Sequence, residues 1–205
     1  MTEHAAAWIL LASASPRRAE LLRQIGVPFR TVAVTVDERG RPGEDAAAQV
    51  QRLARAKAVA GLSRPRRGPA LPVLGADTLV VAGGEVLGKP ASRSAALAML
   101  QRLSGQEHEV LTAVALATGE GVATRLSRSR VRFRPLAPGE AEAYWATGEP
   151  QDKAGAYAVQ GLGAIFVQSL CGSYSGVMGL PLCETAMLLE AAGIPLLGSG
   201  RQERT

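Results

Sequence analysis

The stretch Val73-Leu74-Gly75-Ala76-Asp77-Thr78-Leu79-Val80-Val81-Ala82 is an apolar run broken by one carboxylate and one hydroxyl. A continuous apolar run with β-branched residues predicts a buried strand. Gly83-Gly84 separates it from Glu85-Val86-Leu87, which is the pattern of a β-hairpin with a two-residue turn. A buried Asp is costly unless it is paired, hydrogen-bonded or bound to a metal. We therefore interpret Asp77 as a functional carboxylate, with pairing to a core arginine or capping of a neighbouring backbone as the structural alternative.

A second apolar run, Trp8-Ile9-Leu10-Leu11, leads into Ser13-Ala14-Ser15-Pro16-Arg17-Arg18. The run predicts a strand over 8–14, and Pro16 marks the first turn of a helix over 16–25. Free N–H groups at the helix start would converge there with two hydroxyls and two guanidinium groups, which suits a phosphate. An ordinary serine cap beside two solvated arginines is the alternative.

Lysine is rare in this chain. The 23 basic residues include three lysines, Lys57, Lys89 and Lys153, and the rest are arginines. A compact ammonium group is not replaced by the wider guanidinium in a tight phosphate site. We hypothesise that all three lysines face the same anion, and chance retention in an arginine-biased composition is the alternative.

Length and composition predict one domain over 1–205. The chain has 205 residues, of which 47% are hydrophobic, and we expect mobile ends over 1–7 and 198–205. No stretch approaches the roughly 18 apolar residues that span a bilayer. Residues 1–7 lack the features of a secretion signal, and Cys171 and Cys183 show no zinc or redox spacing. We expect a cytoplasmic protein with two buried, reduced thiols.

The charge balance favours an anionic partner. The formal net charge is +5, which is modest for a nucleic-acid binder. Three Tyr, three Phe and two Trp leave few side chains for base stacking. We therefore predict no dedicated nucleic-acid surface.

The rest of the chain alternates helix-period and strand-period segments without an internal repeat, which predicts a mixed α/β fold. We expect 63–72 to form a loop rich in Pro and Arg, and 156–170 to form a glycine-interrupted hairpin. The remaining strands are expected over 29–36, 108–117 and 122–133, and the remaining helices over 45–62, 92–103, 138–147 and 181–192.

Other catalytic signatures fail, which favours carboxylate chemistry. The Gly-x4-Gly-Lys spacing that ends at Lys89 is followed by Pro90, where a P-loop needs a hydroxyl for Mg²⁺. The chain has two histidines, which give little support for histidine-based catalysis. Asp77 would face the cationic segments above, with Asp37-Glu38 and Asp152 as further candidates. Such a combination suits metal-assisted attack on a phosphoryl group.

These residues resemble the Maf proteins, and more closely their branch of dTTP/UTP pyrophosphatases. The resemblance runs from about Trp8 to Gly193. It rests on motifs in the family's order: Ser13-x-Ser15-Pro16-Arg17-Arg18, Val36-Asp37-Glu38, Gly75-Ala76-Asp77-Thr78, Gly88-Lys89-Pro90, Asp152-Lys153-Ala154-Gly155-Ala156-Tyr157, Gln160-Gly161 and Gly179-Leu180-Pro181.

The resemblance implies a fold, a reaction and a cofactor. The fold is an elongated, twisted mixed β-sheet flanked by helices, with two lobes around a central cleft, as in Maf and ITPase proteins. The reaction is hydrolysis of dTTP and UTP between the α- and β-phosphates, which gives a monophosphate and pyrophosphate and serves nucleotide-pool surveillance. The implied cofactor is a divalent cation, Mg²⁺ or Mn²⁺. Relatives are commonly homodimers, so a homodimer is an expected partner state.

The resemblance also implies roles for particular residues. Carried over, Asp77 looks like the proton acceptor that activates water, and Glu38 with Asp77 would hold the metal. Arg17, Thr78 and Gln160 fall at positions that tune base choice. The side chain of Gln160 offers a donor and an acceptor to a uracil or thymine edge. The phosphates would be held by Ser13, Ser15, Arg18, Lys57, Lys89 and Lys153.

Two other functions stay open. One is the same chemistry on modified or methylated purine nucleotides, although the methylated-purine branch differs around Gln160, which favours pyrimidines here. The other is a non-catalytic, nucleotide-sensing regulator of cell division, because relatives were first linked to inhibition of septum formation. The chain also departs from many relatives at Gly176-Val177-Met178, where they carry Asn-Val-Val, and this difference concerns the pocket rim.

Overall fold

A computed structural model of the chain describes residues 8–64 and 70–196. One mixed sheet of seven strands forms its centre, in the order β2-β1-β3-β5-β6-β7, and β4 pairs with β3 off this path. β1 runs parallel to β2 and β3, and the other pairs are antiparallel. The strands are β1 Ile9–Leu11, β2 Phe29–Thr31, β3 Val73–Ala82, β4 Glu85–Leu87, β5 Glu107–Thr118, β6 Gly121–Phe133 and β7 Val167–Cys171.

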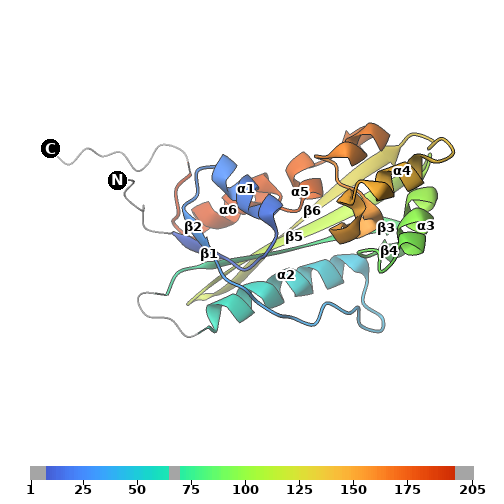
Figure 1. The fold of residues 1–205 in the computed structure, drawn as a ribbon. Helices are drawn as coiled ribbons and strands as arrows, with labels where there is room; N and C mark the ends of the chain where they lie inside the picture. Colours follow the sequence, from blue (N-terminus) through green and yellow to red (C-terminus); the bar gives the residue numbers. More distant parts are fainter. Residues whose placement is uncertain (1–7, 65–69, 197–205) are drawn as a thin grey trace.

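Helices flank both faces of this sheet, as expected. They are α1 Pro16–Gln24, α2 Ala46–Leu62, α3 Arg93–Leu103, α4 Glu140–Ala146, α5 Tyr174–Met178 and α6 Leu182–Ala191, with short 3₁₀ turns η1 Glu149–Asp152, η2 Ala154–Ala156 and η3 Leu162–Phe166. The molecule is elongated: α2 lies along one side of the long strands, α1, α6 and α5 lie on the other, and α3 and α4 lie at the far end (Figure 1). Among the helices in the described part of the chain, none has both the length and the apolar composition for a bilayer crossing.

The middle of β3 has an open edge, and this opening positions the site. On the β1 side of β3, strand β1 pairs with Val73 and Leu74, and β4 pairs with residues 80–82. Within the described residues, no strand pairs with residues 75–79 on that edge. Side chains from both faces of β3 can therefore reach one opening, including the neighbours Asp77 and Thr78.

Most boundaries follow the predictions. The strand over 73–82 and its hairpin through Gly83-Gly84 are confirmed. Helices α2 and α3 begin one residue after their predicted starts because Asp45 and Ser92 are N-caps, whose side chains accept hydrogen bonds from the first turn. The predicted mobile ends and residues 65–69 of the predicted loop lie outside the described residues.

Three predictions about local structure are wrong. β1 and β2 end at Leu11 and Thr31, short of the predicted 14 and 36, because the chain leaves the sheet there to line the opening. The hairpin predicted over 156–170 is absent, since the described chain has the 3₁₀ turn η3 over 162–166 and a single strand, β7, after it. The carboxylate of Glu149 accepts the amides of Leu162 and Gly163, and this contact holds them in the turn.

The two cysteines are exposed, which corrects the prediction that they are buried. Cys171 ends β7, a strand at the edge of the sheet. Cys183 lies in the first turn of α6, whose buried side is formed by Thr185, Leu188 and Leu189. Both cysteines are free thiols.

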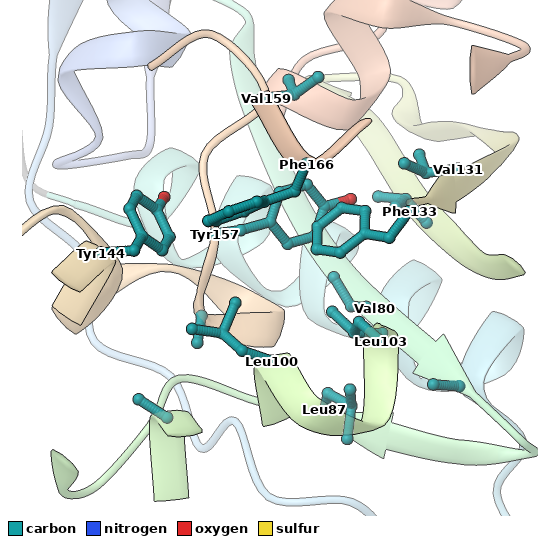
Figure 2. Packing of buried hydrophobic residues seen from close by; sticks show 14 residues of the cluster. Val80, Leu87, Leu100, Leu103, Val131, Phe133, Tyr144, Tyr157, Val159 and Phe166 are labelled. Atoms are coloured by element: carbon teal, nitrogen blue, oxygen red, sulfur yellow. The ribbon is translucent and has the colours of Figure 1, made fainter. Parts of the chain in front are cut away.

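The far end of the sheet is built around aromatic rings. Tyr157 and Phe133 make an edge-on contact with centroids 4.8 Å apart, and Tyr144 and Phe166 make another at 5.1 Å. Figure 2 shows these rings together at the centre of the cluster, with Leu100 and Leu87 below them and Val159 above them. Edge-on aromatic pairs gain about 0.5 to 1.5 kcal/mol beyond burial, so this end is a rigid support for the segment that follows Tyr157.

His108 is a buried titratable group in this aromatic cluster. It is 3% exposed, and its Nε2 lies 2.9 Å from the hydroxyl of Tyr157. Within the described residues its Nδ1 has no hydrogen-bond partner. Burial lowers the pKa of His108 from 6.5 to about 4, because a charged imidazole would lose its hydration there.

We expect stability to fall with acid because of His108. Between pH 6.5 and about 4 the unfolded chain binds a proton at this site and the folded protein does not, so the stability is full above this window and is lost as the pH falls through it. The shift corresponds to roughly 3 kcal/mol. Urea unfolding at about pH 7 and about pH 4.5 measures it, and His108→Gln, which cannot titrate, should remove most of this difference. An equal loss in the wild type and the variant would contradict the assignment.

Candidate active site

A cleft of about 620 Å³ lies at the open edge of β3. Its walls come from the start of α1, from α2 and β3, and from loops around residues 38, 88, 153 and 178. The site residues implied by the family resemblance all line this one cleft, namely Ser13, Ser15, Arg17, Arg18, Glu38, Lys57, Asp77, Thr78, Lys89, Lys153 and Gln160. Of the further candidate carboxylates, Asp152 lines the cleft as well, whereas Asp37 is exposed, pairs with Arg39 and lies outside the lining.

Lys57 connects two carboxylates of the cleft, Asp77 and Glu38. Its Nζ lies 2.6 Å from Oδ1 of Asp77 and 2.6 Å from Oε1 of Glu38. The side chains of Lys57 and Asp77 are 11% and 10% exposed, so each offsets much of the cost of burying the other. The alternative that Asp77 pairs with a core arginine is therefore wrong, because its partner is the lysine that α2 places across from β3.

Glu38 is held in its charged form. The hydrogen bond from Lys57 lowers the pKa of Glu38, and the nearby charges of Lys89 and Arg18 lower it further, while partial burial acts in the opposite direction. At neutral pH this carboxylate is therefore an anion available to a cation.

The start of α1 is open, as a phosphate site requires. Ser15 is the N-cap residue, but its side chain makes no capping hydrogen bond. The hydroxyl of Ser13 instead accepts the backbone N–H of Ser15 at 3.1 Å. The alternative of an ordinary serine cap is therefore wrong, and the first N–H groups of α1 remain available to an anion.

Arg18 is fixed in place at the base of the cleft. Its Nε donates to the carbonyl of Gly179 at 2.7 Å, and its terminal nitrogens donate to Ser13 Oγ at 3.3 Å and Thr78 Oγ1 at 3.4 Å. Burial lowers the pKa of the guanidinium, and the charge of Asp77 acts in the opposite direction. An arginine nonetheless stays protonated at neutral pH, so Arg18 is a half-buried cation held by three hydrogen bonds and not a freely solvated charge.

The remaining cations also line the cleft. Lys153 is ion-paired with Asp152, and Asp152 also lies 3.9 Å from Nη1 of Arg17. Lys89 is exposed on the loop that follows β4. All three lysines of the chain thus line the same cleft, as the hypothesis of a shared anion requires.

The donor set of the cleft fits one kind of metal. The described residues hold no group of three His, Cys, Asp or Glu side chains placed to bind an ion. Asp77 and Glu38 supply two carboxylates that share Lys57. Mg²⁺ commonly takes one or two carboxylates and completes its shell with water and substrate phosphates, so these residues fit such an ion with substrate present.

Sequence reasoning missed groups that support the site from behind. Thr112 on β5 pairs with Thr78 across the sheet, and its hydroxyl donates to the carbonyl of Gly176 at 2.7 Å and lies 3.1 Å from Thr78 Oγ1. Tyr157 lines the cleft while its hydroxyl meets His108. The pairing register and the long-range fold decide these contacts, and no local sequence signal marks them.

Fold and site together define an α/β protein with an anion-binding cleft at a break in a mixed sheet. The chain belongs to the Maf-like protein family, which it matches over residues 8–192. The family resemblance inferred from the motifs is therefore confirmed.

Individual relatives agree with this assignment. Proteins named dTTP/UTP pyrophosphatase are similar in Hahella chejuensis (51% identity over 92% of this chain and 94% of that protein), Aromatoleum aromaticum (53%, 92% and 97%) and Methylococcus capsulatus (53%, 91% and 91%). Among solved structures, the Staphylococcus aureus Ham1 protein aligns with a TM-score of 0.42 and 13% identity, over 61% of this chain and 71% of that chain.

Proposed function

We propose that this chain is a nucleoside triphosphate pyrophosphatase that hydrolyses dTTP and UTP to the monophosphate and pyrophosphate. The observation that most supports this is the buried Asp77, linked through Lys57 to Glu38, in a cleft lined by cations and an open helix start. Relatives that are 51% to 53% identical are named dTTP/UTP pyrophosphatases. The proposal includes a cytoplasmic role in nucleotide-pool surveillance and a homodimeric state.

The triphosphate binds to the cationic part of the cleft. The open N–H groups of α1 attract phosphate oxygens through their partial positive charge. Arg18, already held by Gly179, keeps donors for a phosphate without further ordering of its side chain. Lys89 and Lys153 act as compact point charges on the remaining oxygens.

Asp77 accepts the proton of the attacking water. The water oxygen bonds to phosphorus at the α–β bridge, and the bond from that phosphorus to the bridging oxygen breaks. The proton passes to the Asp77 carboxylate, and the electron pair of the broken bond stays on the oxygen that leaves. Lys57, 2.6 Å from Oδ1, orients the carboxylate and offsets charge that develops beside it.

Glu38 and Asp77 would hold the divalent cation, Mg²⁺ or Mn²⁺, together with the substrate. When bound, such an ion neutralises charge on the phosphate oxygens as the bridge breaks. Arg17, Thr78 and Gln160 line the same cleft and are assigned to base choice.

Release of pyrophosphate across a nucleotide panel tests the proposal. With Mg²⁺ or Mn²⁺, we expect dTTP and UTP to be cleaved fastest among dTTP, UTP, CTP, ATP, GTP, ITP and 7-methyl-GTP. Removal of the metal with EDTA should abolish cleavage, because the side chains of the cleft alone do not neutralise the charge that develops on the phosphate oxygens as the bridge breaks.

Two results would contradict the proposal in different ways. If ITP or 7-methyl-GTP were cleaved fastest, the chemistry would stand and the pyrimidine assignment would fall. If no nucleotide were cleaved but one bound tightly, the protein would be a nucleotide sensor and not an enzyme.

A further inference from the structure

The segment of residues 158–163 brings Gln160 to the cleft. Ala158, Val159 and Gln160 line the opening, and the chain then turns away into η3. The backbone N–H of Gly161 donates to the carbonyl of Ala158 at 3.3 Å, so the segment folds back on itself at Gln160. Gln160 itself is exposed, and its position therefore depends on what holds the chain on either side of it.

Two side chains outside the cleft hold this segment at both ends. The carboxylate of Glu149 accepts the N–H of Leu162 at 3.0 Å with Oε2 and that of Gly163 at 3.0 Å with Oε1. The hydroxyl of Tyr144 accepts the N–H of Ala158 at 3.1 Å and donates to Glu149 Oε1 at 2.5 Å. Three backbone donors that flank Gln160 are thus satisfied by one connected pair of side chains.

The glycines beside Gln160 allow this close approach. A Cβ atom on Gly163 would lie 2.6 Å from the hydroxyl of Tyr144, and one on Gly161 would overlap the carboxylate of Glu149. Neither glycine has a positive φ, so close packing and not backbone conformation explains their presence. Glycine at positions 161 and 163 therefore leaves the room that the side chains of Glu149 and Tyr144 need beside the segment that carries Gln160.

The pair Tyr144 and Glu149 is itself held in place by the aromatic cluster. Tyr144 is 4% exposed and packs edge-on against Phe166, the last residue of η3. Burial raises the pKa of Glu149, but hydrogen bonds from Tyr144 and from the amides of Gly163 and Leu162 outweigh it, so the pKa is lowered overall and the side chain is a carboxylate at neutral pH.

We propose that Glu149, together with Tyr144, is a positioning residue for base choice: it holds residues 158–163 so that Gln160 meets the nucleobase at a fixed distance. This rests on the proposed function and deepens it. Neither residue lines the cleft, so neither touches the nucleotide. A base edge is recognised by hydrogen bonds that fail when donor and acceptor shift by a fraction of an ångström. Looseness in this segment should therefore harm recognition of the base more than cleavage of the phosphates.

The test compares Glu149→Gln and Tyr144→Phe with a matched control, Glu140→Gln. Gln keeps the size of Glu149 but turns an amide donor toward one of the two backbone N–H groups, and Phe removes the hydroxyl alone. Glu140 is also a carboxylate that accepts from a side chain, that of Arg134, and from a backbone amide, that of Ala137, but its hydrogen bonds do not reach residues 158–163. The readouts are kcat and KM for dTTP, UTP, ATP and GTP, the binding of dTMP and of inorganic tripolyphosphate, and the melting temperature.

We expect both variants to lower the preference for dTTP over GTP in kcat/KM by roughly 10- to 100-fold, mainly through a higher KM for dTTP. In both variants the affinity for dTMP should fall while the affinity for tripolyphosphate stays unchanged. The control Glu140→Gln should keep the wild-type preference for dTTP over GTP and have a melting temperature similar to those of the two variants. In a Gln160→Ala background, Glu149→Gln should change the preference no further.

The proposal would be overturned by an unchanged preference in both variants, or by equal loss for all nucleotides that follows the melting temperature. Because the wild-type protein would still cleave dTTP, either result would contradict the positioning role of Glu149 and leave the proposed function standing. A wild-type protein that neither cleaves nor binds any nucleotide would instead overturn the proposed function, and this assignment with it.

Discussion

We expect Asp77→Asn to lower the rate of pyrophosphate release from dTTP by roughly 10²- to 10⁴-fold, the usual size of a general-base contribution. Asparagine has nearly the same shape but cannot accept the proton from the attacking water. It also removes one of the two carboxylates proposed to hold the metal. The loss should therefore appear in kcat, measured with saturating dTTP and metal.

The variant should remain folded, which makes the prediction testable. Lys57 keeps an ion pair with Glu38 at 2.6 Å when Asp77 becomes neutral, so no buried ammonium is left alone. Thermal unfolding of the variant checks this. Asp37→Asn is the matched control, because Asp37 adjoins Glu38 but is exposed, pairs with Arg39 and does not line the cleft. Wild-type turnover in a folded Asp77→Asn protein would contradict the role of Asp77.

Gly75→Ala should destabilise the protein by about 3 kcal/mol, the upper part of the range for overpacking. A Cβ on Gly75 would lie 2.6 Å from the backbone nitrogen of Ala58 and 3.1 Å from its Cα. These are backbone atoms of α2, so no side chain can rotate away, and the helix must move off the sheet. Chemical denaturation measures the loss as a shift in midpoint.

The same substitution should also reduce activity, because α2 carries Lys57 and β3 carries Asp77. Moving the helix off the strand separates the ammonium from the carboxylate it orients. Gly119→Ala serves as the control, since Gly119 lies in the turn between β5 and β6 with open space around it and no positive φ. Its expected effect is within about 0.5 kcal/mol. A Gly75→Ala protein as stable as Gly119→Ala would show that α2 does not pack this tightly.

Local chemistry made much of the fold predictable. The apolar run over 73–82 and the Gly83-Gly84 turn predict a buried strand that enters a β-hairpin, and both are present as β3 and its pairing with β4. Asp45 and Ser92 mark where α2 and α3 begin, because their side chains accept hydrogen bonds from free N–H groups in the first turn of each helix. The hairpin predicted over 156–170 does not form because the carboxylate of Glu149, distant from Gly163 in sequence, accepts a backbone N–H that strand pairing would use.

The sequence by itself determined which residue types the site would use. A carboxylate in a buried strand, hydroxyls and arginines at a helix start, and three lysines amid arginines each point to an anion, because burial and charge are costly without a partner. Of the predicted residues, all except Asp37 line one cleft.

Tertiary structure alone decided how these residues act on one another. Lys57 lies between Asp77 and Glu38 because α2 packs on the open part of β3, where Gly75 permits contact. Thr112 contacts Thr78 because the register of β3 and β5 places the two residues opposite each other. Glu149 holds the segment that carries Gln160 by accepting hydrogen bonds from the backbone of Leu162 and Gly163. Such contacts join residues far apart in the chain, so they depend on how helices and strands pack together and leave no periodic or local signal in the sequence.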